Sequence, residues 1–114
     1  MGAVNPKVLE ELRAIAGPGF LVELIDIFLR EATGYLGTLR QSIEARDDRV
    51  LDRAAHTLKG SSGNLGAQAL SRLSGELQTA ARAKDWTRAA ELIVTIEAEY
   101  GMVRAELEAE KAGR

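Results

Sequence analysis

Apolar residues recur at helical spacing along almost the whole chain, and this periodicity constrains the fold more than any other feature. In the longest such segment, residues 20–45, the apolar side chains form one stripe that covers roughly 100° of a helix. No alternating run of β-branched residues and no hairpin dipeptide indicates a strand. The pattern therefore predicts an all-α protein.

Short breaks divide this pattern into helices. Asn5 before Pro6 marks a start, because Asn caps helix N-termini and proline fits the first helical position. Gly17-Pro18-Gly19 ends the first segment, and Asp85 is expected to cap the last. The predicted helices cover residues 6–16, 20–45, 48–65, 67–84 and 86–110, with the tail from Glu108 onward expected to fray.

The connections between these helices are only a few residues long, which forces successive helices to be antiparallel neighbours. We therefore predict one domain over residues 1–114, an antiparallel up-down-up-down four-helix bundle with a short additional N-terminal helix. A chain of 114 residues is long enough to bury such a core without disulfide bonds or bound metal ions to stabilise it.

Charge and composition exclude several classes of protein. The chain lacks cysteine, so disulfides and thiolate chemistry are absent. Its net charge is −2 with both signs mixed along the sequence, which argues against a nucleic-acid or membrane partner. The longest apolar run, residues 20–29, contains two carboxylates and is too short for a bilayer core of about 30 Å. The N-terminus does not resemble a signal peptide, and we expect a cytoplasmic monomer.

The single histidine, His56, lies on the outer side of the third predicted helix. A helical wheel places it on the same face as Lys59, Gly60 and Gly63, opposite an inward stripe around Ala54. A glycine inside a helix costs about 1 kcal/mol relative to alanine. Glycines beside an exposed imidazole leave it prominent and let another backbone approach. The pattern indicates a docking site with a nucleophile at its centre.

Lys59 follows His56 by one helical turn, so its ammonium can reach an anionic group on the imidazole, such as a phosphoryl group. A surface helix that merely carries one His and one Lys is the alternative at this point. Other chemistries fail on the residues available. A di-metal bundle needs paired Glu-x-x-His motifs, whereas Arg53 stands three residues before the only histidine. Neither a metal nor a cofactor site is expected.

The stretch His56-Thr57-Leu58-Lys59-Gly60-Ser61-Ser62 resembles the signature of histidine-containing phosphotransfer (HPt) domains of two-component phosphorelays. The leading helix, the 20–29 run and the Asp85-Trp86 turn also look like that family's layout. The resemblance implies that His56 accepts the phosphoryl group, that Lys59 stabilises it and that Gly60 gives a partner access. It also implies no ATP site, because the partner receiver domain supplies Mg²⁺.

The same resemblance suggests partners and a docking surface. The partners would be response-regulator receiver domains and a hybrid sensor histidine kinase. Receivers of the family dock on the histidine-bearing helix and the helix before it, which makes Gly63, Val22, Ile27 and Leu29 candidate docking residues. For the three apolar residues, packing against the first helix is the alternative.

The sequence is therefore compatible with three functions. The first is a phosphorelay carrier without an ATP site of its own, which is not an autonomous enzyme. The second is a phospho-acceptor module excised from a larger chemotaxis-type or hybrid kinase; the charged tail ending at Arg114 favours a free-standing protein. The third is a non-phosphorylated adaptor bundle, in which His56 would be dispensable.

Overall fold

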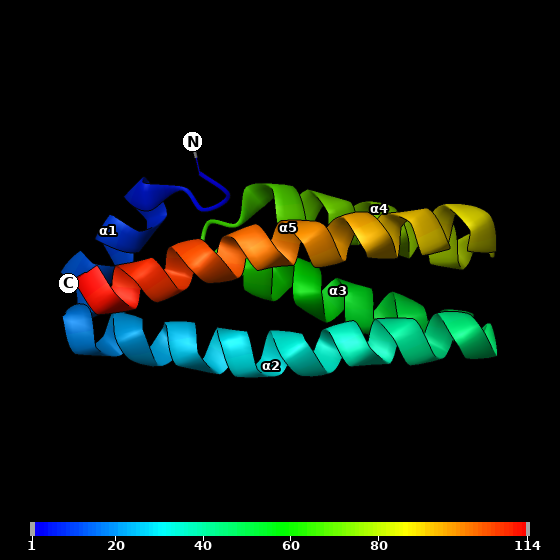
Figure 1. The fold of residues 1–114 in the computed structure, drawn as a ribbon, viewed down its shortest axis with the longest axis horizontal. Helices are drawn as coiled ribbons and strands as arrows, with labels where there is room; N and C mark the ends of the chain where they lie inside the picture. The colour runs from blue at the N-terminus through cyan, green and yellow to red at the C-terminus, as the bar shows by residue number, and fades with distance from the viewer. Residues whose placement is uncertain (1, 114) are drawn as a thin grey trace.

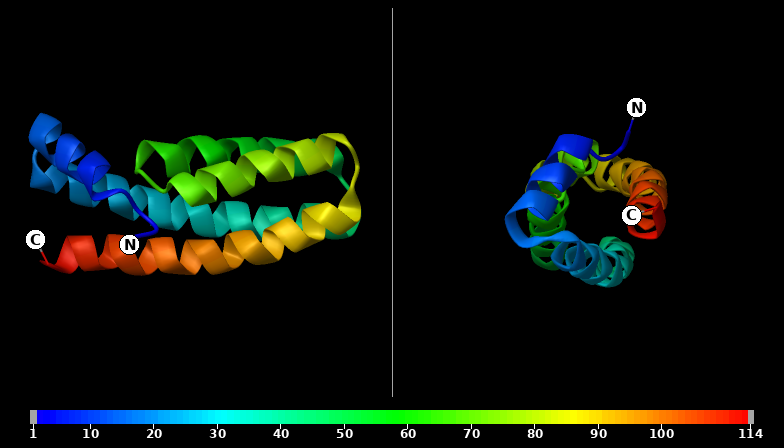
Figure 2. Two further views of the ribbon diagram at one scale, coloured as in Figure 1. Left: turned by 90° about the horizontal axis from the view of Figure 1, so that it is seen from above. Right: turned by 90° about the vertical axis from the view of Figure 1, so that its left-hand side faces the viewer.

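The computed structural model describes residues 2–113, which form five helices. These are α1 (Pro6–Ala16), α2 (Pro18–Ala45), α3 (Asp48–Asn64), α4 (Gln68–Arg82) and α5 (Trp86–Gly113). Helices α2 to α5 run side by side with alternating direction, while α1 crosses one end of the bundle (Figures 1 and 2). The described residues contain no strand. The predicted class, a four-helix bundle with an additional N-terminal helix, is confirmed.

Local signals set most of the helix starts. The Asn5 side chain accepts a hydrogen bond of 3.0 Å from the amide of Lys7, as expected for a cap. Asp47 caps α3 by accepting from the amide of Val50 at 3.2 Å. Asp85 caps α5 in the same way. These short polar side chains satisfy backbone donors that the helix leaves unpaired, so their positions could be predicted from sequence.

Several helix boundaries differ from the expectation by one to three residues: α3 ends at Asn64 rather than at residue 65, and α4 covers Gln68–Arg82 rather than residues 67–84. Helix α2 begins at Pro18 rather than at residue 20, because Gly17 alone makes the turn with a φ of 93° and Pro18 takes the first helical position. The tail after Glu108 does not fray, since α5 continues to Gly113. Ion pairs join this last part of α5 to α1 and α2 through Arg13–Glu110 and Lys111–Asp26. Arg114 lies outside the described residues.

The core is aliphatic and lies between the four long helices. Fully buried leucines and isoleucines come from each of them, including Ile25, Leu58, Leu77 and Ile96. Helix α3 packs against α2 on one side and against α4 on another, and its remaining side is open to solvent. The bundle therefore buries one side of α3 and presents another side to solvent.

One buried polar group in this core lacks a partner. The hydroxyl of Ser62 is fully buried, and no hydrogen bond to it is found among residues 2–113. We expect Ser62→Ala to raise the free energy of unfolding by about 1 kcal/mol, because an unsatisfied buried hydroxyl carries a desolvation penalty. Urea denaturation measures this change. Ser74→Ala is the matched control, since the buried Ser74 hydroxyl donates to the Leu70 carbonyl at 2.8 Å. If both substitutions shift stability equally, the explanation fails.

Candidate functional site

The imidazole of His56 stands on the solvent-facing side of α3. The opposite side of this helix packs into the core through Leu51, Ala54, Ala55, Leu58 and Ser62. His56 itself is exposed, and its ring makes no hydrogen bond with residues 2–113. The predicted orientation is therefore correct, and the ring nitrogens are accessible to a second molecule.

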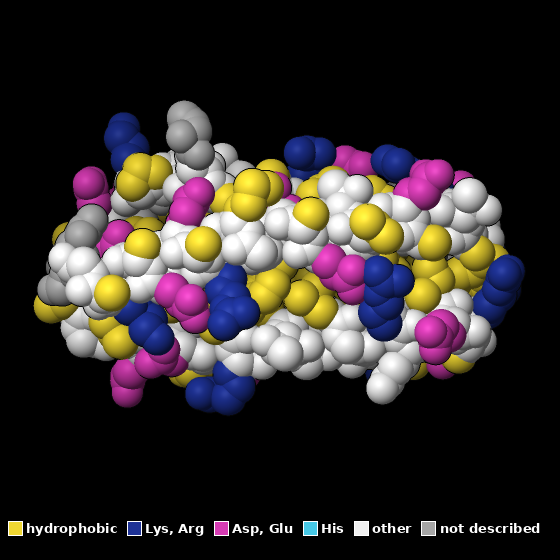
Figure 3. Space-filling view, viewed as in Figure 1, with side chains coloured by type: hydrophobic (Ala, Val, Ile, Leu, Met, Phe, Trp, Pro, Cys, Tyr) yellow, Lys and Arg dark blue, Asp and Glu magenta, His cyan; other side chains and the backbone are white. Residues whose placement is uncertain are grey.

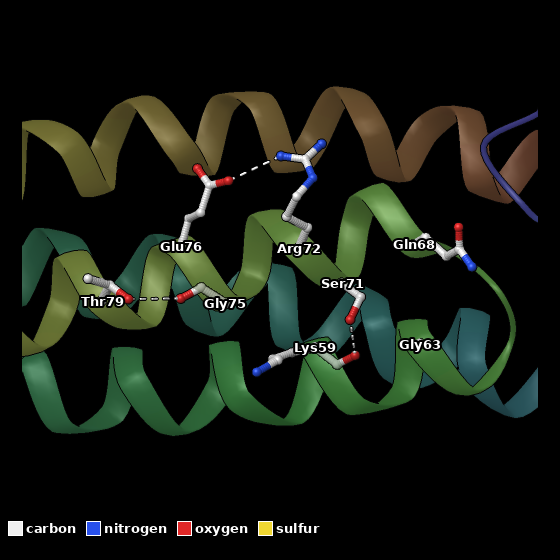
Figure 4. Close-up of a pocket in the computed structure, with 8 residues that line it drawn as sticks. All are labelled: Lys59, Gly63, Gln68, Ser71, Arg72, Gly75, Glu76 and Thr79. Carbon is white, nitrogen blue, oxygen red and sulfur yellow. Dashed lines mark hydrogen bonds and ion pairs between the residues drawn. The ribbon is translucent and has the colours of Figure 1, made fainter.

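Lys59 lies one turn after His56, and its side chain crosses toward α4. A Cβ placed on Gly75 would lie 3.5 Å from Cδ and 3.8 Å from Nζ of Lys59, so the lysine stem rests against a helix position without a side chain. Figure 4 shows the lysine nitrogen directed away from Gly63, toward the N-terminal half of α3. The lysine nitrogen therefore points along α3 toward the turn that carries His56.

An open groove of about 520 Å³ runs along α3 and α4 beside this lysine (Figure 4). The hydroxyl of Ser71 closes one side by donating to the Lys59 carbonyl at 2.8 Å, and Arg72 and Glu76 form an ion pair at its rim. Sequence reasoning did not assign α4 a role in the site. Gly75, a glycine inside the predicted fourth helix, was the one available signal.

A second contribution of α4 surrounds Asp52, one turn before His56. Gln78 Nε2 donates to one carboxylate oxygen of Asp52 at 2.9 Å, and Arg82 Nε donates to the other at 3.1 Å. Partial burial alone would raise the pKa of Asp52, but these hydrogen bonds outweigh it and hold the pKa below its usual value. The carboxylate is therefore ionised and already paired when a partner approaches.

Of the four predicted docking residues, Gly63 and Ile27 lie on the sides expected of them. Gly63 occupies the exposed face of α3, although a Cβ there would lie 3.4 Å from Ser71 Oγ. Ile27 is 41% exposed and lines an apolar groove of about 460 Å³ where α1, α2 and α3 meet. Phe20, which the sequence analysis did not single out, lies in the same groove and is 43% exposed.

Val22 and Leu29 are not brought together with His56. Val22 lines a small cavity with Arg13 and Glu110, which places it toward α5. Leu29 packs against the core, and its carbonyl accepts a hydrogen bond of 3.3 Å from the hydroxyl of Tyr100 on α5. Val22 thus lies toward α1 and α5 and Leu29 packs on the core, and the docking role of both residues stays a prediction.

Metal-ligand clusters and membrane-spanning helices are both absent from the part of the chain that the structure describes. Among residues 2–113, no group of three or more His, Asp or Glu side chains is placed to hold a metal ion. Within that same range, no helix has both the length and the apolar character needed to cross a membrane.

A four-helix bundle that presents one accessible histidine, followed by a lysine and a glycine on the same face, is the architecture of a histidine phosphotransfer module. The chain belongs to the Hpt domain family, whose model matches residues 23–109. Histidine phosphotransfer in phosphorelays is the function of this family.

Individual relatives agree with this assignment. The phosphorelay protein LuxU of Vibrio harveyi is 36% identical over 67 residues, which cover 59% of each chain. The aerobic respiration control sensor protein ArcB of Escherichia coli is 25% identical over 72 residues, 63% of this chain but only 9% of ArcB. The crystal structure of histidine-containing phosphotransfer protein B of Pseudomonas aeruginosa superimposes with a TM-score of 0.92 at 30% identity, covering 97% of this chain and 96% of that one.

Proposed function

We propose that this protein carries a phosphoryl group on His56 between the aspartates of receiver domains in a multistep phosphorelay. The observation that supports this most strongly is the accessible imidazole, with Lys59 held beside it and the open Gly60 next to it. The carrier would be monomeric and cytoplasmic, with residues 1–114 as one domain. It would have no ATP site and would not act as an autonomous enzyme.

Because the imidazole ring of His56 is accessible, it can take the phosphoryl group directly from the partner. The lone pair of an unprotonated imidazole nitrogen attacks the phosphorus of an aspartyl phosphate on the partner. An N–P bond forms, the P–O bond to the aspartate breaks, and its electron pair leaves with the carboxylate, while the other ring nitrogen keeps its proton. Lys59 stabilises the phosphoryl charge by a charge-assisted contact. A good leaving group and an accessible nucleophile require no further base from this chain; Mg²⁺ is expected on the receiver.

Docking would use the open face of α3 and the apolar groove next to it. A Cβ on Gly60 would have no neighbour within 4 Å, so this side of α3 is free for a partner backbone. Phe20 and Ile27 supply exposed apolar surface at the C-terminal end of α3. Such a small contact is typical of transient signalling complexes. Receiver domains and a hybrid sensor histidine kinase are the proposed partners.

Intact-mass measurement after incubation with aspartate-phosphorylated receiver domains tests this function. A gain of one phosphoryl mass that is lost in acid supports the carrier. The similarity to a short part of ArcB favours a second candidate, a phospho-acceptor module of a larger kinase. That candidate predicts labelling by an ATP-loaded histidine-kinase catalytic domain and by none of the receivers. If neither donor labels the protein, it is an adaptor and the proposal is wrong.

Gly60 offers a test in which stability and activity move in opposite directions. We expect Gly60→Ala to raise the free energy of unfolding by about 1 kcal/mol through helix propensity. The same methyl group should slow phosphoryl transfer several-fold, because it protrudes into the space a receiver would occupy. Urea denaturation and transfer kinetics measure the two effects.

Gly101→Ala is the matched control for this substitution. Gly101 is also an exposed glycine inside a helix, with no neighbour within 4 Å of a Cβ, but it lies on α5. It should stabilise the bundle equally and leave transfer unchanged. Equal transfer rates for the two variants would show that Gly60 plays no part in partner access.

A further inference from the structure

Two arginines beside His56 have no partner in the structure. Arg49 and Arg53 are exposed on α3, and neither side chain forms an ion pair or hydrogen bond within residues 2–113. On a helical wheel, Arg49 lies within about 20° of His56 and Arg53 within about 60°. Arg53 is on the flank of His56 opposite to Lys59. The N-terminal half of the exposed α3 face is thus lined by free cations.

Most other arginines of the bundle are paired. Arg40 binds Glu97 at 2.6 Å and Arg104 binds Glu108 at 3.3 Å, and on the face formed by α2 and α5 basic and acidic side chains are interspersed (Figure 3). The nearest carboxylate to His56 along α3, Asp52, is already bonded to Gln78 and Arg82. Within α3, the three cations Arg49, Arg53 and Lys59 outnumber the two carboxylates Asp48 and Asp52, so this helix is net positive in a chain with a net charge of −2.

We infer that Arg49 and Arg53 are docking cations that bind carboxylates on the receiver domain, around its phosphorylated aspartate. This inference rests on the proposed function. The phosphoryl group on the partner's aspartate is a dianion, and unpaired arginines complement that group's charge and the charge of any carboxylates around it. Helical side chains tilt toward the N-terminus, so Arg49, about 10 Å along the axis from His56, leans away from any group on the imidazole. It contacts the partner instead.

The position of these cations also orients the partner. Arg49 and Arg53 lie toward the start of α3, whereas the apolar groove of Phe20 and Ile27 borders its end at Asn64 and Leu65. A receiver with acidic groups at one side of its docking surface and apolar groups at the other would fit in only one direction along α3. Charges at the rim of an interface act mainly on the rate of encounter, and salt screens them.

The test is the second-order rate constant of phosphoryl transfer, measured at several salt concentrations. The probe is the receiver domain that labels the wild-type protein fastest. We expect the double variant Arg49→Glu/Arg53→Glu to react about tenfold more slowly, or slower still, at low salt, with a flatter or inverted salt dependence. Arg49→Gln/Arg53→Gln should fall between. Arg104→Glu, which reverses one charge on α5, should behave like the wild type.

Three further outcomes would overturn the assignment, and they can be told apart. If the wild-type protein accepts phosphate but the double variant shows the same rate and the same salt dependence, the arginines are not docking residues and the proposed function stands. If the phosphorylated double variant loses phosphate faster than the wild type in isolation, the arginines act on the phosphoryl group. If no receiver labels the wild-type protein, the proposed function fails and this inference fails with it.

Discussion

The substitution His56→Gln is expected to abolish phosphoryl acceptance while leaving the bundle folded. Glutamine offers no nucleophilic ring nitrogen, and the sequence contains no other histidine. The imidazole is exposed and makes no hydrogen bond with the described residues, so its removal costs the fold nothing. Glutamine is also a good helix former. Intact mass after incubation with a phosphorylated receiver should show no phosphoryl gain, and urea denaturation should show a change within about 0.5 kcal/mol.

The neighbouring residue supplies the control for this experiment. Thr57 follows His56 directly, and its hydroxyl donates to the Arg53 carbonyl at 3.1 Å within the same helix. Thr57→Ala should retain labelling. Persistent acid-labile labelling of His56→Gln would place the acceptor on a different side chain and refute the proposed role of His56.

The second large effect is expected for Lys59→Ala, which should slow phosphoryl transfer by about tenfold to a hundredfold. Its stem rests against Gly75 of α4 and its ammonium points toward the turn that carries His56, so we expect it to stabilise charge on the phosphoryl oxygens as the group moves. Because Lys59 is solvent-exposed, the effect should be smaller than that of a buried oxyanion-hole donor. Rapid-quench kinetics of the wild type and of Lys59→Ala measure this change in the transfer rate. The substitution should leave the fold unaffected.

Two further variants show whether charge alone is responsible. Lys59→Arg keeps the charge and should recover part of the rate, although a planar guanidinium differs in shape from an ammonium. Lys7→Ala removes an exposed lysine from α1 and should have no effect. An unchanged rate for Lys59→Ala would mean that Lys59 is an ordinary solvated lysine.

The helices and the face of His56 could be predicted because both depend on residues close together in sequence. Caps such as Asn5 and Asp85 act over two or three residues, and the helical period alone places His56, Lys59 and Gly60 outward. The same reasoning could not find the pairing of Asp52 with Gln78 and Arg82. Those contacts join residues 26 and 30 positions apart, and they depend on the register of α3 against α4.

Periodicity also failed where a helix is apolar nearly all round. The first half of α2 exposes Phe20 and Ile27 toward α3, while Val22 lines a cavity toward α5 and Leu29 packs against the core. All four side chains are hydrophobic, so no pattern of polarity separates the two sides. Only the packing of α1 and α5 decides between them. The charged end of α5 was predicted to fray for a similar reason. Its ion-pair partners, Arg13 and Asp26, lie on other helices and are not visible in the local sequence.

The groups that surround His56 all belong to one helical hairpin. Asp52 and Lys59 come from α3, and Gly75 and Gln78 come from α4, which follows after a connection at residues 65–67. The two ends of the chain are joined differently: the amides of Ala3 and Val4 bond to Glu106, more than 100 residues away. The N-terminal segment also touches the hairpin at its connection, where the amide of Asn5 donates to the carbonyl of Gly66 at 2.9 Å. The reactive centre is thus encoded by residues close together in sequence, and the start of the chain braces the turn between its two helices.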